Sequence, residues 1–217
     1  MSSSPYSNEP VSSFTHLIAT LLSIAGLSLL VTLAALSGSA THVVAFAIFG
    51  AALILLYLAS TLYHFISKNH PAKELFRILD HSMIYVLIAG TYTPITLLIL
   101  PLGWGWTLFG IIWGLSLIGI VKKVLRPPVP GWFSATFYLL MGWLILIALG
   151  PLQERLSNEG LFWLALGGVF YTIGTVFFTL DHRFPLQRWY TLHDIFHVFV
   201  MLGSLCHFWF MLKFVLP

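Results

Sequence analysis

The stretch 43-VVAFAIFGAALILLYLASTLYHFI-66 decides the fold of this chain. It contains no charged side chain, and it is longer than the roughly 20 mostly apolar residues that a helix needs to cross a bilayer. Polar groups that are out of place in lipid appear only near its end, where Ser60 precedes His64 by one helical turn. The stretch therefore predicts a transmembrane helix that ends in chemically active side chains.

Six further segments have the same apolar character, and polar, Gly or Pro residues separate them. With the first stretch, the predicted spans are 17–36, 43–66, 78–100, 104–121, 132–149, 161–180 and 192–214. These lengths suit membrane helices and exceed those of barrel strands. We predict an all-α integral membrane bundle of seven transmembrane helices, in which a short polar segment, 1–16, precedes a single domain, 17–217.

The composition excludes a soluble domain. Hydrophobic residues make up 59% of the 217 residues and charged residues only 8%, whereas soluble domains carry about 25% charged residues. We interpret the net charge of +3 as a signal of topology, and we expect no nucleic-acid partner. The lone Cys206 excludes an internal disulfide and a cysteine-rich metal site.

The basic residues predict the orientation. Eight of the ten fall on one side of a seven-span chain: Lys68, Lys73, Arg77, Lys122, Lys123, Arg126, Arg183 and Arg188. Only Arg155 and Lys213 fall opposite. Because loops rich in Lys and Arg stay in the cytoplasm, we expect a cytoplasmic N-terminus and an external C-terminus. The compact chain suits a bacterial inner (plasma) membrane.

Four polar side chains lie near the same membrane face in this topology, although the topology was predicted from the Lys and Arg residues alone. His64 ends the second span, Asp80 begins the third, and His193 and His197 begin the last. Ionisable groups inside a membrane are costly and indicate function. Residues four apart share one face of a helix, so His193 and His197 can bind the same ion. Three imidazoles predict Zn²⁺, with His64, His193 and His197 as its ligands.

Three protein ligands and a water molecule are typical of a catalytic zinc site, where the pKa of that water falls to about 7. Asp80 could bind the ion, orient the water or act as the general base. Ser60 could donate a hydrogen bond to Asp80 or to a substrate carbonyl oxygen. We therefore predict Asp80 and Ser60 as the catalytic residues.

Simpler interpretations compete with a catalytic zinc. The imidazoles could be hydrogen-bonded to headgroups or loop carbonyls, or the zinc could be structural and only join the helices. A proton relay without a metal is a third alternative, which we favour less because three close imidazoles suit an ion better. We expect His16 to pair with Glu9 at the interface, with a supporting or gating role as the alternative. His81 is expected to face away from Asp80, because adjacent helix residues point about 100° apart. His207, about 21 Å beyond His193 along a helix, is predicted to be a buried hydrogen-bonding residue.

At these residues the chain resembles the hemolysin III family, the prokaryotic arm of the progestin and adiponectin receptor membrane proteins. The resemblance runs from Glu9 to Leu212 and is carried by 60-STLYH-64, 79-LDHSMIY-85, 89-AGTYTP-94, 193-HDIFH-197 and 206-CHF-208. It departs near the start, where the family often has Glu-Glu-x-x-Asn and this chain has 8-NEPVS-12.

The resemblance implies a seven-helix bundle with zinc near the cytoplasmic face. It implies His64, His193 and His197 as ligands, with Asp80 holding the zinc-bound water and Ser60 beside it. It also implies kinship with alkaline ceramidases and a link to membrane lipid homeostasis.

Three functions remain open. The first is a zinc-dependent intramembrane hydrolase that cleaves an amide or ester of a membrane lipid, ceramide-like or otherwise acylated. The second is a non-enzymatic membrane sensor or regulator with a structural zinc. The third is a lytic, pore-forming protein, as the family name suggests. The sequence does not indicate the oligomeric state.

Overall fold

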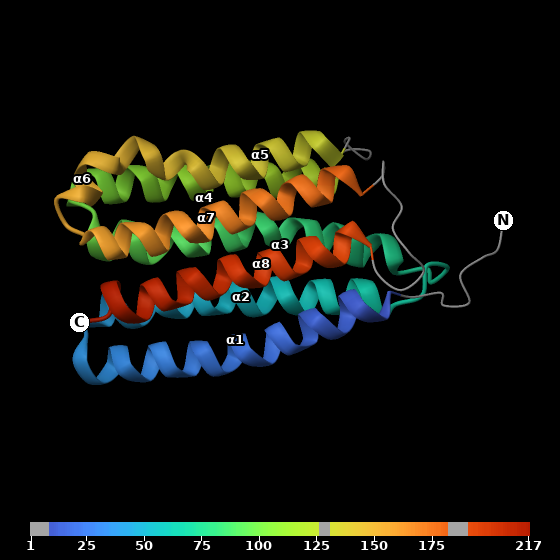
Figure 1. Ribbon diagram of the computed structural model, residues 1–217, viewed down its shortest axis with the longest axis horizontal. Coiled ribbons are helices and arrows are strands. Elements are labelled where there is room, and N and C mark those ends of the chain that lie inside the picture. Colours follow the sequence, from blue (N-terminus) through green and yellow to red (C-terminus); the bar gives the residue numbers. More distant parts are fainter. Residues whose placement is uncertain (1–8, 126–130, 182–190) are drawn as a thin grey trace.

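The computed structural model describes residues 9–125, 131–181 and 191–217, and Figure 1 shows them as a bundle of long helices lying side by side. Seven helical segments in the described residues are long and apolar enough to cross a membrane. The helices are α1 (Pro10–Ser37), α2 (Ala40–Phe65), α3 (Lys73–Pro94) with η1 (Ile95–Ile99), α4 (Leu102–Leu125), α5 (Gly131–Trp143) with η2 (Leu144–Ala148) and α6 (Leu149–Gln153), α7 (Asn158–Leu180), and α8 (Leu192–Phe210) with η3 (Met211–Val215). The predicted all-α, seven-span fold is confirmed.

The first helix begins earlier than predicted, at Pro10 instead of residue 17. Proline suits the first turn of a helix, because its missing N–H has no partner there in any case. The polar residues of this turn are not left in solvent: Ser12, Ser13 and His16 are buried against the rest of the bundle. The extra two turns thus bring polar side chains of α1 into the protein interior.

The order of packing brings distant parts of the chain together. α1 packs on α2, α2 on α3 and α7 on α8, while α8 also contacts α1. One link across α2 and α8 is the Tyr57 hydroxyl, which donates a hydrogen bond to Ser204 Oγ at 2.6 Å. The start of α1 and the end of η3 lie at opposite ends of the bundle (Figure 1), as an odd number of spans requires.

The described basic residues agree with the sequence-based topology. Lys68 lies in the connection from α2 to α3, Lys73 begins α3, and Lys122 and Lys123 lie in the last turn of α4. All these positions are at the end of the bundle where α1 begins. Three of the residues used for the prediction, Arg126, Arg183 and Arg188, lie outside the described residues.

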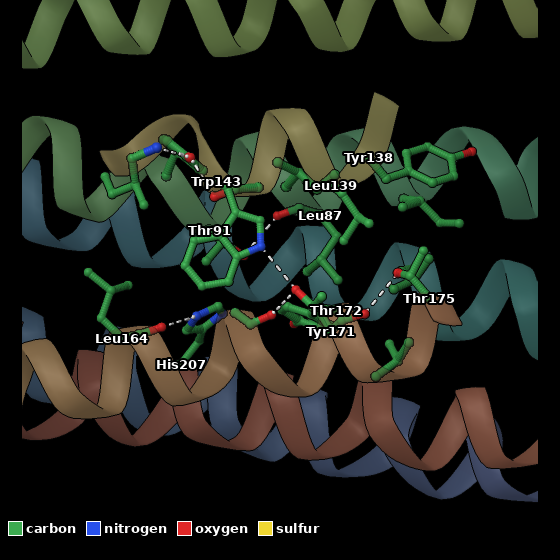
Figure 2. A pocket seen from close by; sticks show the side chains of 18 of the residues that line it. Leu87, Thr91, Tyr138, Leu139, Trp143, Leu164, Tyr171, Thr172, Thr175 and His207 are labelled. Carbon is green, nitrogen blue, oxygen red and sulfur yellow. Dashed lines mark hydrogen bonds between the residues drawn. The ribbon is translucent and has the colours of Figure 1, made fainter. Parts of the chain in front are cut away.

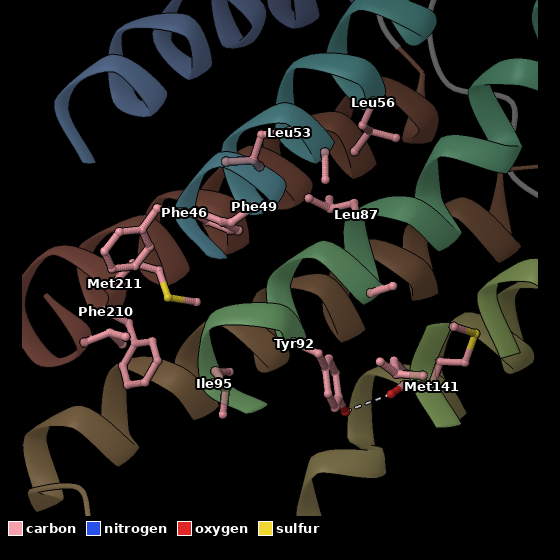
Figure 3. Packing of buried hydrophobic residues seen from close by; sticks show 14 of the residues in the cluster. Phe46, Phe49, Leu53, Leu56, Leu87, Tyr92, Ile95, Met141, Phe210 and Met211 are labelled. Atoms are coloured by element: carbon pink, nitrogen blue, oxygen red, sulfur yellow. Dashed lines mark hydrogen bonds between the residues drawn. The ribbon is translucent and has the colours of Figure 1, made fainter. Parts of the chain in front are cut away.

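The interior between α2, α3 and α8 is filled by aromatic and aliphatic side chains (Figure 3). Phe46, Phe49 and Phe210 are fully buried there. Since lipid is as apolar as these side chains, close packing rather than escape from water holds membrane helices together. Gly90 of α3 permits such an approach, because a Cβ there would lie 2.5 Å from the Cβ of Ala52 on α2.

Pro94 changes the helix that carries Asp80. The α-helical part of α3 ends at Pro94, and a π-helical turn, η1, continues the span. Proline removes one backbone hydrogen bond and crowds the preceding turn, and a wider turn is one way to absorb that. Just beyond Pro94, the hydroxyl of Thr96 donates to the carbonyl of Tyr92 at 3.0 Å.

Candidate metal centre

Three imidazoles converge at the end of the bundle where α1 begins. His64 lies in the last turn of α2, and His193 and His197 lie in the first turns of α8. The Nε2 atom of His193 is 3.3 Å from Nε2 of His64 and 3.1 Å from Nε2 of His197. One ligand atom from each side chain lies within 4.8 Å of the other two. The three side chains expected to share an ion are thus together, while binding of the ion stays a prediction.

The spacing of these nitrogens fits a tetrahedral cation. Zinc–nitrogen bonds of 2.0–2.1 Å place two ligand nitrogens of a tetrahedral site about 3.3–3.4 Å apart, close to the 3.3 and 3.1 Å that separate Nε2 of His193 from Nε2 of His64 and of His197. A shared proton could join only two of the three imidazoles, which would leave the third nitrogen without a donor. A divalent cation satisfies all three lone pairs at once, so these residues fit Zn²⁺.

The start of α8 is held in place by a capping box. The Thr191 side chain accepts a hydrogen bond from the backbone N–H of Asp194 at 3.2 Å, and Asp194 Oδ2 accepts one from the backbone N–H of Thr191 at 2.8 Å. Such reciprocal bonds satisfy two N–H groups that a helix start leaves free. They fix the first turn of α8, and therefore the direction from which His193 and His197 enter the site.

The two predicted catalytic residues lie beside the imidazoles. Ser60 and Asp80 are both buried, and they line one cavity together with His193 and His197. This cavity has a volume of about 380 Å³ and extends through the bundle as far as Gln153 on α6.

Apolar side chains make up most of the cavity wall. Figure 2 shows its middle part, where Leu87 of α3, Leu139 of α5 and Leu164 of α7 lie around it. The polar groups there are mostly occupied with one another: Trp143 Nε1 donates to Thr172 Oγ1 at 3.0 Å. His193, His197 and Asp80 therefore lie at one end of a long and largely apolar space.

The contacts of Asp80 differ in part from the sequence-based expectation. Within the described residues no hydrogen bond joins it to Ser60, so of the two partners suggested for this hydroxyl, the substrate carbonyl is the one that stays available. His81 was expected to face away from Asp80, but it lines the same cavity, and its Nδ1 lies 3.7 Å from Asp80 Oδ2. The same Nδ1–H donates to the carbonyl of Arg77 at 2.7 Å, which turns the ring back along the helix toward Asp80.

The first turns of α1 contribute contacts that the sequence did not predict. Glu9 does not pair with His16; its Oε2 accepts a hydrogen bond from Nδ1 of His64 at 2.6 Å. The hydrogen bond with His64 lowers the pKa of Glu9 to about 2; burial opposes this shift, and the charge of Lys68 adds to it. Glu9 is therefore a carboxylate at neutral pH, and it lies directly behind one of the three imidazoles.

Two further histidines have different positions. His16 stacks on His197, with ring centroids 3.6 Å apart and ring planes within 8°, and neither of its nitrogens has a hydrogen-bond partner among the described residues. His207 is buried far from the triad, and its Nε2 donates to the carbonyl of Leu164 at 3.2 Å (Figure 2). The prediction for His207 is confirmed, and the expected Glu9–His16 pair is wrong.

Comparison with known proteins identifies relatives over nearly the full length. The family described as haemolysin-III related matches residues 5–208. Hemolysin-3 of Bacillus cereus is 44% identical over 212 residues, which cover 96% of this chain and 92% of that protein. The hemolysin-3 homolog of Bacillus subtilis (strain 168) is 44% identical over 200 residues, or 92% and 91% of the two chains. The human monocyte to macrophage differentiation factor is 29% identical over 174 residues, or 77% and 69%.

Proposed function

Because the chain belongs to the haemolysin III family, we propose that it is a zinc-dependent hydrolase of a lipid amide or ester bond. Its seven apolar spans make it an integral membrane protein, and its membership among bacterial hemolysin III proteins indicates the plasma membrane. One observation carries the proposal. Three converging imidazoles, of which His64 and His197 are buried and His193 is partly buried, lie beside a carboxylate and a hydroxyl at one end of a long, largely apolar cavity.

The residues of the site divide the work of hydrolysis. His64, His193 and His197 would hold the ion, which when bound supplies a Lewis acid and makes water nucleophilic near neutral pH. Asp80 accepts the proton that the attacking water loses and returns it to the leaving nitrogen or oxygen as the carbon–heteroatom bond breaks. Ser60 donates a hydrogen bond to the carbonyl oxygen, where negative charge develops.

The shape of the cavity favours an acylated substrate. The carbonyl of a lipid amide or ester must reach the imidazoles while its hydrocarbon chain needs an apolar path. The wall formed by residues such as Leu87, Leu139 and Leu164 supplies that path, and ligand sites of this kind combine apolar walls with a few placed polar groups. A ceramide-like lipid has both parts, so it is the first substrate class to test.

Asp80→Asn tests the chemistry separately from the metal. The amide keeps the shape of the carboxylate but cannot take up a proton, so hydrolysis should fall by about 10²–10⁴-fold, the usual worth of a positioned general base. Zinc content should be unchanged, because the three imidazoles are intact. The measurement is release of fatty acid from ceramides and phospholipids by the detergent-purified wild type and variant, with zinc quantified in the same samples.

Two other functions make different predictions for these samples. If the wild type contains zinc but cleaves no lipid, and Asp80→Asn keeps the biological effect, the zinc is a structural clamp in a membrane sensor. The names of the Bacillus relatives suggest lysis; conductance in reconstituted bilayers that survives zinc removal would support a pore and contradict the hydrolase.

A further inference from the structure

We infer that Glu9 is a positioning residue of the metal centre, which fixes the orientation and the tautomer of His64 and makes metal affinity depend on the docking of the first turns of α1. The inference rests on the proposed zinc site and adds to it a residue outside the membrane-spanning helices.

Glu9 is attached to the end of α2 at two points. Its Oε2 accepts from Nδ1 of His64 at 2.6 Å, and its backbone N–H donates to the His64 carbonyl at 3.2 Å. The second carboxylate oxygen, Oε1, lies 3.2 Å from Nζ of Lys68. The carboxylate is therefore held against the imidazole by its own backbone and by a neighbouring charge.

This contact decides which nitrogen of His64 can face the ion. A carboxylate only accepts hydrogen bonds, so Nδ1 of His64 carries the proton, and Nε2 keeps the lone pair that points toward His193. Metal-binding histidines commonly have such a carboxylate behind them, which fixes the ring and raises its basicity. Among the described residues, Nδ1 of His197 has no hydrogen-bond partner, so a carboxylate supports His64 where none supports His197.

The neighbouring residues of α1 fasten both helices that supply the imidazoles. Ser13 Oγ donates to the carbonyl of Thr61 on α2 at 3.3 Å, and Ser12 Oγ donates to Asp194 Oδ1 on α8 at 2.5 Å. One turn further, His16 lies flat against His197. The start of α1 thus bridges α2 and α8 where the ligands meet, and Glu9 is the member of this bridge that contacts a ligand through its charge.

The expected effect follows from what the carboxylate supplies. Removing an outer partner of a metal ligand typically lowers metal affinity about 10–100-fold. Glu9→Ala removes both the acceptor and the charge, so it should have the full effect. Glu9→Gln keeps an acceptor of the same shape, so it should retain part of the affinity and separate orientation from charge.

The matched control is Glu74→Gln. Glu74 lies at the same end of the bundle, but its carboxylate pairs with Arg77 at 2.5 Å and is exposed. The substitution Glu74→Gln removes one negative charge from the same end of the bundle, as the Glu9 variants do, but it changes no contact with His64, His193 or His197. Its metal affinity should equal that of the wild type.

The experiment is titration of the metal-free, detergent-purified full-length chains with Zn²⁺ against a competing chelator, and with Co²⁺ followed by its visible absorption. We expect Glu9→Ala to bind Zn²⁺ about 10–100-fold more weakly and to show a changed Co²⁺ spectrum, which a purely structural loss would not produce. Glu9→Gln, which keeps the local packing, provides the same test if Glu9→Ala does not fold.

The outcomes separate this inference from the proposed function. If the wild type binds one ion and both Glu9 variants bind it as tightly and with the same Co²⁺ spectrum, Glu9 has no positioning role, although the metal site stands. If the wild type itself binds neither ion, the proposed zinc site is wrong and the inference falls with it.

Discussion

Ser60 and His64 occupy the same face of α2, one turn apart, and the proposed function gives them different tasks. His64 turns its Nε2 toward His193, whereas Ser60 lines the cavity in which a substrate would lie. No hydrogen bond to Asp80 occupies the Ser60 hydroxyl within the described residues. Its role is therefore best tested with the substrate present.

Ser60→Ala should slow lipid hydrolysis about 10²–10³-fold, the usual cost of removing one donor to a developing oxyanion. Zinc content should stay at the wild-type level, because the hydroxyl is not among the predicted ligands. The control is Ser82→Ala, which removes another buried hydroxyl that does not line the cavity. Single-turnover rates and bound zinc would be measured together; an equal loss in both variants would contradict a specific role for Ser60.

The sequence predicted the proximity of His64, His193 and His197, because each falls at the end of an apolar span that lies on the same membrane face. It could not predict Glu9 as the partner of His64. That contact joins residues 55 positions apart and depends on how α1 packs against α2. The departure from the family pattern at 8-NEPVS-12 gave no indication of this partner.

Among the helices, α2 and α3 pack closely together, and this packing fixes the position of Ser60 and His64 on α2 relative to Asp80 on α3. Gly90 faces Ala52 at the contact, with no room for a side chain. Gly114 of α4 differs, because nothing lies within 4 Å of the position that its Cβ would take. The two glycines therefore provide a matched pair.

Gly90→Ala should destabilise the protein by about 1–3 kcal/mol, the usual cost of overpacking a close contact. Gly114→Ala should be neutral or stabilising by up to about 1 kcal/mol, since alanine has the higher helix propensity. Thermal unfolding of both variants in the same detergent checks this. Equal midpoints would mean that the contact between α2 and α3 is not tight.

At the level of elements, apolar length alone was enough to predict all seven spans. The sequence-based boundaries were less accurate where polar residues are buried, as in the early start of α1. The breaks inside spans were also harder to predict: nothing in the sequence singled out the 3₁₀ turn at Leu144–Ala148. There the backbone N–H of Ile145 donates to the hydroxyl of Tyr92 at 2.7 Å, a tertiary contact that no local pattern encodes.

In the whole molecule, the candidate site exists because α8 returns to lie beside α1 and near α2. The hydrogen bond from Tyr57 to Ser204 and the stacking of His16 on His197 are parts of this closure. The sequence predicted the common membrane face of the histidines, but their contact across α2 and α8 requires the packing order of the helices. The cavity leading away from them was likewise visible only in three dimensions.

We propose that imidazoles from α2 and α8 together hold one divalent cation. The most direct measurement is the zinc content of the detergent-purified chain, with zinc-edge X-ray absorption of the same sample. We predict about one zinc per chain with three imidazole nitrogens at about 2.0–2.1 Å, loss of this zinc in His193→Ala, and its retention in His207→Ala. A folded wild-type protein that takes up no stoichiometric zinc, or zinc that His193→Ala leaves in place, would contradict the claim.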